Sequence, residues 1–342
     1  MNTIIETTGL QKHFGRVRAL DGLDLRVAAG EVHGFLGPNG AGKSTTIRIL
    51  LGLARATGGS VTLFGQDPWT DAVELHRRIA SVPGDVSLWP NLTGGEAIDL
   101  ISRLRGGAAD HVAYAARKAR LLDVFQLDPK KKGRSYSKGN RQKVALVAAF
   151  ATPAELYLLD EPTSGLDPLM EVIFNDEIRR VSGEGATVLL SSHILSEVEQ
   201  LCDRVSIIRA GQTVQSRTLA ELRQLTRTEI SFSAGTMTPE RLSRLAAQYQ
   251  LSLVADRVHF TVESSAVVAV LPLLADLDVQ GLTVAPPSLE ELFLREYAEA
   301  PVADAGAGAG GSAGAGVAAA PAADAAPAAD AAAAAAPGAH RS

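Results

Sequence analysis

Along residues 1–215, short apolar runs alternate with segments whose apolar positions have helical spacing. The clearest runs are VHGFL (32–36), LYLLD (156–160), ATVLLSS (186–192) and RVSIIRAG (204–211). Runs of this length, bounded by turn residues, are typical of β-strands. Strands that alternate with helices in this way predict an α/β domain with a largely parallel sheet.

The pattern restarts on a smaller scale over residues 216–299. TEISFSA (228–234) and RVHFTVE (257–263) have the composition of strands. PERLSRLAAQYQ (239–250) and SLEELFLREYAEA (288–300) have apolar positions at helical spacing. This segment is predicted to form a small α+β accessory domain.

Residues 300–342 have a different composition from the rest of the chain. They are mostly Ala, Gly, Pro and Asp, with no aromatic residue and no periodic apolar face. Such a segment cannot bury enough apolar surface to offset the entropy of ordering it. It is predicted to be a disordered tail.

Composition narrows the class of protein. The formal net charge of −5 over 342 residues gives no indication of a nucleic-acid partner. The single cysteine, Cys202, excludes an internal disulfide, fits a reducing cytosol and is interpreted as a core residue. No apolar run reaches about 18 residues outside the tail, so no segment is predicted to span a membrane. A function at a membrane would therefore require separate membrane-spanning partners.

The stretch GPNGAGKST (37–45) carries a specific chemical signal. Its spacing Gly37-x-x-x-x-Gly42-Lys43-Ser44 follows a predicted strand and precedes the helical pattern STTIRILLGL, the context of a phosphate-binding loop. Glycines permit backbone conformations that turn N–H groups toward phosphate oxygens, and the helix N-terminus adds its positive end. Lys43 is expected to reach the terminal phosphates and Ser44 to coordinate magnesium. The alternative is a flexible glycine turn. It is disfavoured because the motif occurs between a predicted strand and a predicted helix, as a phosphate-binding loop does.

A second motif, ELYLLDEPTSGLD, places two adjacent acids at the end of a buried run. Asp160 would lie at the carboxyl end of the strand, near the loop, where it can hold magnesium through water. Glu161 would point differently and orient or deprotonate an attacking water. Two acids with separate tasks are what hydrolysis needs, whereas a kinase brings its own acceptor. The alternative is a strand-ending acid pair before a proline turn.

A third motif, YSKGNRQKVALVAAF (136–150), precedes the acid pair. Ser137 and Gly139 stand before a helix predicted from Asn140 onward, with the hydroxyl and N–H groups pointing outward as an anion site. The chain thus has two predicted anion-binding helix N-termini but only one phosphate loop. The second helix N-terminus is therefore predicted to bind the nucleotide of another molecule. An ordinary serine-capped helix is the alternative.

In this order the motifs resemble the ATP-binding subunit of ABC transporters. The resemblance covers residues 4–299 and is strongest to the drug-exporter type, similar to daunorubicin-resistance ATPases. It implies a P-loop ATPase fold, a RecA-like parallel sheet with a helical subdomain at about 90–150. It also implies residue roles: a Walker A loop of Gly37, Pro38, Asn39, Gly40, Ala41, Gly42, Lys43, Ser44 and Thr45; magnesium ligands Ser44 and Asp160; the catalytic base Glu161; the switch histidine His193; a signature of Ser137, Lys138, Gly139 and Asn140; a D-loop with Asp167; and Phe14 stacking on adenine.

Two of these assignments have alternatives, and the chain departs from the family at one further position. His193 could be a structural residue at a strand end, and Phe14 could belong to the core. The family usually has a glutamine after the strand end that precedes LWPNLT, and this chain has Gly84 there. Whether the neighbouring Asp85 replaces that glutamine stays open. Trp89 and Pro90, in SLWPNLT, are expected to form a rigid apolar anchor for a helix of the membrane subunit.

The resemblance implies an ATPase that powers export of a drug, antibiotic or lipid-like compound through separate permease subunits. ATP and Mg²⁺ are the expected cofactors. ATP would lie between the Walker A loop of one copy and the signature of a second copy or a related subunit. The expected location is peripheral, at the cytoplasmic face of the cell membrane, with no nucleic-acid partner.

A soluble ABC ATPase acting on nucleic acid or ribosomes is the competing class. DNA-repair members insert a long coiled coil, but only about 90 residues separate Thr45 from Tyr136 here, with no heptad run. Ribosome-acting members carry two phosphate loops per chain, and this chain has one. A catalytically idle regulatory subunit is disfavoured by the intact Glu161.

Overall fold

The structure is a computed structural model that describes residues 2–107, 110–224, 227–236, 239–254, 256–263 and 266–285. The helix expected over 288–300 and the predicted tail over 300–342 lie outside the described residues. Within these ranges, every helix is too short or too polar to cross a membrane.

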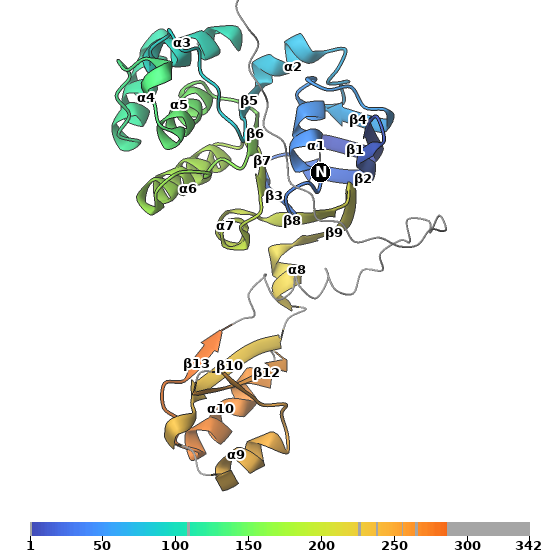
Figure 1. Ribbon diagram of the computed structural model, residues 1–342, viewed down its shortest axis with the longest axis vertical. Helices are drawn as coiled ribbons and strands as arrows, with labels where there is room; N and C mark the ends of the chain where they lie inside the picture. The colour runs from blue at the N-terminus through green and yellow to red at the C-terminus, as the bar shows by residue number, and fades with distance from the viewer. Residues whose placement is uncertain are drawn as a thin grey trace, which may run out of the picture. The chain divides into compact units, whose positions relative to one another are not determined.

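A six-stranded sheet forms the centre of the main body (Figure 1). Its strands, in spatial order, are β5 (Ile79–Val82), β6 (Leu156–Asp160), β7 (Thr187–Ser192), β3 (Val32–Leu36), β8 (Arg204–Arg209) and β9 (Gln212–Thr218). All neighbouring pairs are parallel except β8 and β9. Every residue of β3, β6 and β7 is buried, which explains their continuous apolar runs. The predicted largely parallel α/β sheet is confirmed.

A second sheet of three antiparallel strands was not predicted from the sequence. It contains β2 (Val17–Ala28), β1 (Thr3–Phe14) and β4 (Gly58–Leu63), in that order. β1 and β2 form a hairpin that closes between Phe14 and Val17. The hairpin therefore presents Phe14 at its tip.

Two apolar cores lie on opposite faces of the central sheet. Alternate residues of β6 show the division, because Tyr157 and Leu159 join one core whereas Leu156 and Leu158 join the other. The second core contains α1 (Lys43–Leu50) and the antiparallel sheet. The first contains α6 (Pro168–Gly183), α7 (Leu195–Leu201) and a helical group, α3 (Gly94–Leu104), α4 (His111–Val124) and α5 (Lys138–Ala151), which gathers beside β5 and β6 (Figure 1). The shorter helices are α2 (Ala72–Arg78), η1 (Gly133–Ser135) and α8 (Leu219–Gln224).

A separate antiparallel sheet lies further along the chain. Its order is β11 (Ser252–Val254), β12 (Arg257–Glu263), β10 (Arg227–Ser233) and β13 (Thr283–Ala285). With η2 (Ala234–Thr236), α9 (Pro239–Ala246) and α10 (Val267–Asp276) it forms the α+β arrangement expected for this region. It has its own core, which includes Phe232, Phe260 and Leu274. The predicted domain limits at residues 215 and 299 stay predictions.

An ion cluster joins the helical group to α6. The side chain of Glu177 is 5% exposed and accepts hydrogen bonds from Arg120 Nη2 at 2.8 Å and Arg180 Nε at 2.9 Å. Burial raises the pKa of Glu177, but the hydrogen bonds and charges of the two arginines lower it further, so this pKa lies below its ordinary value.

We predict that Glu177→Gln lowers the free energy of unfolding by about 1–3 kcal/mol at pH 7, measured by urea denaturation. Because folding depresses the pKa of Glu177, its stabilising effect is present above the unfolded-state pKa and is lost as pH falls through the folded-state pKa. The difference between variant and wild type should therefore shrink in acid. Asp176→Asn, which removes an exposed carboxylate from the same helix, should change stability little. A difference that is constant from neutral to acid pH would contradict the prediction.

Candidate functional site

Two glycines of the loop between β3 and α1 could not be replaced without displacing the backbone. A Cβ atom at Gly37 would lie 2.4 Å from the carbonyl oxygen of Ile208. At Gly42, where φ is 112°, it would lie 2.8 Å from the carbonyl oxygen of Ala19. The two ends of the loop are thus packed against neighbouring strands, which fixes the glycine spacing independently of any ligand.

Lys43 is the first residue of α1, and its side chain is buried. The ammonium donates hydrogen bonds to the carbonyl oxygens of Gly37 at 2.6 Å and Pro38 at 3.3 Å. Its positive charge therefore lies inside the loop, beside the positive N-terminal end of the helix. This arrangement forms a concave site for anions.

The two acids at the end of β6 point in different directions, as the sequence predicted. Asp160 is buried, and its Oδ1 accepts a hydrogen bond from Ser191 Oγ at 2.6 Å. Glu161 has a φ of 46°, a left-handed conformation that is rare for this residue type. Its N–H donates to the carbonyl oxygen and hydroxyl of Ser191, which hold the turn. The left-handed turn carries the Glu161 side chain away from Asp160.

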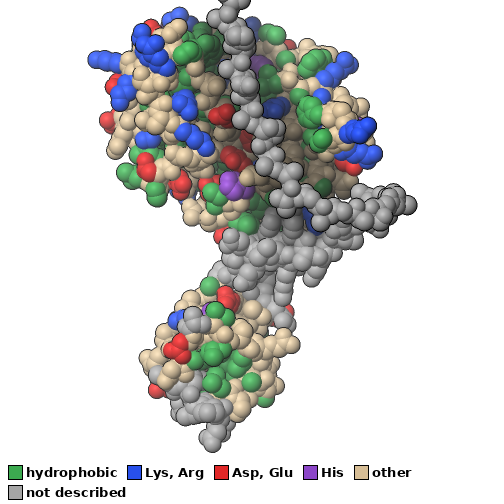
Figure 2. Space-filling view, viewed as in Figure 1, with side chains coloured by type: hydrophobic (Ala, Val, Ile, Leu, Met, Phe, Trp, Pro, Cys, Tyr) green, Lys and Arg blue, Asp and Glu red, His purple; other side chains and the backbone are tan. Residues whose placement is uncertain are grey.

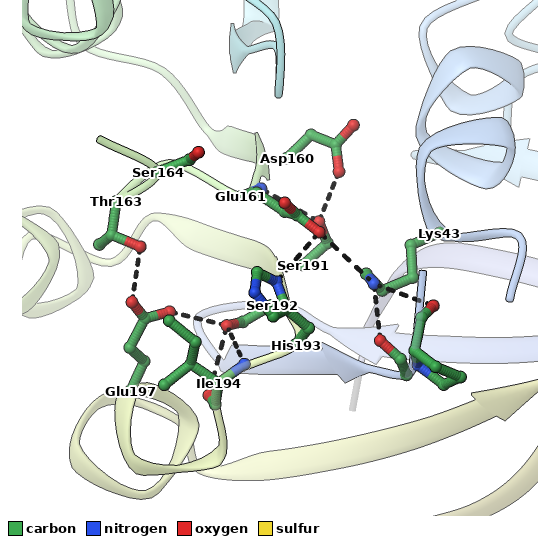
Figure 3. A network of polar contacts seen from close by, with 12 residues as sticks. Lys43, Asp160, Glu161, Thr163, Ser164, Ser191, Ser192, His193, Ile194 and Glu197 are labelled. Carbon is green, nitrogen blue, oxygen red and sulfur yellow. Dashed lines mark hydrogen bonds and ion pairs between the residues drawn. The ribbon is translucent and has the colours of Figure 1, made fainter. Parts of the chain in front are cut away.

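Glu161 meets two basic groups at the carboxyl edge of the parallel strands (Figure 3). Its Oε1 lies 3.6 Å from Lys43 Nζ and 3.2 Å from His193 Nδ1. His193 directly follows β7, and its side chain is 47% exposed. The structure therefore brings Lys43, Asp160, Glu161 and His193 together, although they come from three segments of the chain.

Phe14 borders the same cavity as the phosphate loop. Its ring is exposed, which excludes a position in the core, and Lys12 Nζ lies 4.8 Å from the ring centre. A cavity of about 320 Å³ is bordered by Phe14, the loop and Glu161. An aromatic face at one end and a buried ammonium at the other suit a nucleotide, with its base at the ring and its phosphates at the loop.

A neighbouring cavity of about 390 Å³ is where a magnesium ion would fit. Ser44 and Asp160 both border it, and a hydroxyl with a carboxylate offers the oxygen ligands that Mg²⁺ prefers. Gly84 also borders this cavity, and a Cβ atom there would lie 3.4 Å from Asp160 Oδ2. Among the described residues, no three His, Cys, Asp or Glu side chains are grouped to hold a metal. Phosphate and water oxygens would therefore have to complete the coordination of a magnesium ion.

The signature segment differs from the prediction in one respect. The helix α5 begins at Lys138 rather than at Asn140, because Ser137 Oγ caps it by accepting a hydrogen bond from the Asn140 N–H at 3.3 Å. The serine hydroxyl keeps its own hydrogen for donation to an anion. A Cβ atom at Gly139 would lie 2.4 Å from the carbonyl oxygen of Gly165, so this glycine permits close contact with the loop before α6.

The signature and the phosphate loop are separate within one chain. Between described residues, no hydrogen bond or ion pair joins 137–140 to 37–45. Lys138 Nζ instead donates to Ser164 Oγ at 3.1 Å, and Asp167, predicted as a D-loop residue, caps α6 by accepting from the Met170 N–H. On the face that Figure 2 shows, the charges are mixed, with basic side chains over α3, α4 and the antiparallel sheet and acidic side chains between these groups.

Ser191 was missed at the sequence level. It holds both Asp160 and the Glu161 backbone, and the only signal was a polar pair, Ser191 and Ser192, at the end of an apolar strand. Polar residues that end a buried strand beside a catalytic motif are expected to bond to the neighbouring strand end, since their burial requires a partner.

The fold and this site together define a P-loop nucleotide hydrolase. The family model for ABC transporters matches residues 20–164. The daunorubicin resistance ATP-binding protein of Streptomyces coeruleorubidus is 40% identical over 224 residues, 65% of this chain and 70% of that protein. The bacitracin transport ATP-binding protein of Bacillus licheniformis is 36% identical over 233 residues, 68% of this chain and 75% of that protein. The chain belongs to the ABC transporter family of ATP-binding proteins, as the sequence motifs predicted, and is an ATPase of that family.

Solved structures agree with this assignment. The structure of an ATP-binding subunit of an ABC transporter is 31% identical, with a TM-score of 0.61, and the match covers 65% of this chain and 92% of the other. A bacterial ABC transporter cassette solved as a dimer is 25% identical, with a TM-score of 0.57 and coverage of 63% and 99%.

We predict that Glu161→Gln keeps its affinity for Mg-ATP and loses hydrolysis by about a hundredfold or more, because the amide retains the shape but cannot accept a proton. Phosphate release and equilibrium nucleotide binding measure the two properties. Glu184→Gln, which removes an exposed carboxylate at the end of α6, is the matched control and should hydrolyse ATP normally. Near-normal turnover in Glu161→Gln would remove this residue from the role of base.

Proposed function

We propose that this chain hydrolyses ATP to power export of a drug, antibiotic or lipid-like compound through separate membrane-spanning subunits. The observation that carries the hydrolytic part is the position of Glu161 Oε1 between Lys43 Nζ and His193 Nδ1 at the edge of the sheet. The named functions of two relatives, daunorubicin resistance and bacitracin transport, support the export part. The same relatives support a peripheral location at the cytoplasmic face of the cell membrane.

Each site residue has a task in this proposal. Phe14 stacks on the adenine ring, and the loop N–H groups with Lys43 bind the β- and γ-phosphates. Ser44 and Asp160 would hold Mg²⁺, which neutralises phosphate charge when bound. Glu161 orients the attacking water and accepts its proton, while His193, oriented by Glu161, donates to the γ-phosphate.

The loop at Gly84 departs from the family at the magnesium side of this site. Gly84 has no side chain to offer, and the exposed Asp85 borders the same cavity as Ser44 and Asp160. Asp85 is therefore the side chain of this loop that can contact a water of the metal. Trp89, 46% exposed a few residues further on, remains the proposed apolar anchor for the permease.

A second copy of the chain, or a related subunit, completes the nucleotide site in this proposal. The residues of the signature, Ser137 to Asn140, lie at an accessible helix N-terminus, and no hydrogen bond or ion pair between described residues joins them to the chain's own phosphate loop. ATP bound by one copy is then covered by the signature of the other. Binding closes the two copies together, and hydrolysis with product loss lets them part.

Mixing two inactive variants tests the shared site. Lys43→Ala damages a chain's own loop, and Ser137→Arg blocks the signature that it offers to a partner. In a twofold dimer, a mixed pair has one doubly damaged site and one intact site, so equal mixing leaves roughly a quarter of all sites intact. Each variant alone should be nearly inactive, and the mixture should recover ATP hydrolysis.

Mixing would fail to restore activity if both sites of a dimer must be intact for hydrolysis. Cross-linking tests the shared site in that case, because it does not depend on activity. Cysteines introduced near Ser44 and near Ser137 should link between chains when ATP is present, while the native Cys202 is buried and should not interfere. If neither the mixture recovers nor the cross-link forms, the shared-site proposal is wrong. Co-purification of the tagged chain with an integral membrane protein supports export, whereas recovery with ribosomes or nucleic acid supports the soluble alternative.

A further inference from the structure

One carboxylate ties together two segments that flank the hydrolysis site (Figure 3). Glu197, in the first turn of α7, accepts a hydrogen bond at each of its oxygens. Thr163 Oγ1 donates to Oε1 at 2.6 Å, and Ser192 Oγ donates to Oε2 at 2.7 Å. We call these three residues the Glu197 bridge.

Both ends of the Glu197 bridge are adjacent to residues of the site. Thr163 comes two residues after Glu161 and begins the loop that leads to Asp167. Ser192 directly precedes His193, and its hydroxyl also accepts a hydrogen bond from the Ile194 N–H at 2.9 Å. The Ser192 hydroxyl thus links the residue before His193 to the residue after it, and the same hydroxyl is bound by Glu197.

The bridge also receives support from the signature helix. Gln142 of α5 is buried, and its Nε2 donates to the carbonyl oxygen of Pro162 at 2.8 Å. The loop after Glu161 is therefore fixed from α5 at Pro162 and from α7 at Thr163. Thr163 and Ser192 are both buried, so each hydroxyl needs a hydrogen-bond partner inside the protein. Losing Glu197 would leave two buried hydroxyls without this acceptor.

We propose that Glu197 is a positioning residue for ATP hydrolysis, which rests on the function proposed above. It fixes Ser192 relative to Thr163 and so keeps the His193 imidazole against Glu161. Glu197 lies behind the site and acts through His193 rather than on the nucleotide. Its task depends on bridging both hydroxyls and not on its negative charge.

Three substitutions separate bridging from charge. Glu197→Gln removes the charge but still reaches both hydroxyls, because the amide oxygen accepts from one and the amide nitrogen donates to the other. Glu197→Asp keeps the charge but is one methylene shorter and cannot span the pair. Glu197→Ala removes both contacts. We expect Ala and Asp to lower kcat and kcat/KM together by about 10- to 100-fold, and Gln to stay near wild type.

Nucleotide affinity and melting temperature complete this series. Affinity for ATP, measured in equilibrium binding, should be the same in all three variants, and a matched melting temperature shows that each is folded. Ser196→Ala, an exposed change in the same turn of α7, is the control and should hydrolyse ATP normally. If Asp hydrolyses like wild type and Gln like Ala, the charge matters and the proposal is wrong.

A double variant tests whether Glu197 acts through His193. If it does, Glu197→Ala should lower kcat no further in a His193→Ala background, because the group that it positions is already gone. A full additional loss would show a role elsewhere in the fold and overturn the proposal. Glu161→Gln separates this outcome from failure of the proposed function. If Glu161→Gln is inactive while Glu197→Ala is fully active, only the positioning role is wrong.

Discussion

The turn at the end of β6 is the constraint on which the rest of the site depends. The chain leaves a fully buried strand at Asp160 and enters a left-handed conformation at Glu161, where φ is 46°. Both the carbonyl oxygen and the hydroxyl of Ser191 hold the Glu161 N–H, and the same hydroxyl donates to Asp160. A strained backbone conformation persists only where several surrounding contacts hold it in place. This turn points the side chains of two adjacent acids in different directions, which the proposed division of tasks between a metal ligand and a catalytic base requires.

The parallel sheet places that turn beside the other segments of the site. Because β3, β6 and β7 run in the same direction, their carboxyl ends deliver the phosphate loop, the acid pair and His193 to one edge. The two apolar cores on opposite faces of the sheet hold these strands in place. Elements outside the sheet then refine the site. The antiparallel hairpin supplies Phe14, and α7 supplies Glu197.

Polar contacts behind the site connect segments that serve different nucleotides in the proposed dimer. Gln142 belongs to the helix whose N-terminus carries the signature, and it holds the carbonyl oxygen of Pro162. Thr163, the next residue, reaches Glu197 and through it the residue before His193. Three hydrogen bonds and the peptide bonds between them thus connect the signature helix of a chain to its own His193.

The sequence by itself determined the family, the strands of the parallel sheet and the residues of the phosphate loop, acid pair and signature. These features are local, since burial of a strand and the spacing of a loop are set by consecutive residues. Only the tertiary structure decided the antiparallel sheet, the strand order, the start of α5 at Lys138 and the bridge through Glu197. Thr163 and Glu197 are 34 residues apart, and neither has a periodicity or spacing that marks its partner. Contacts of that kind come from how the chain folds back on itself, so no local pattern predicts them.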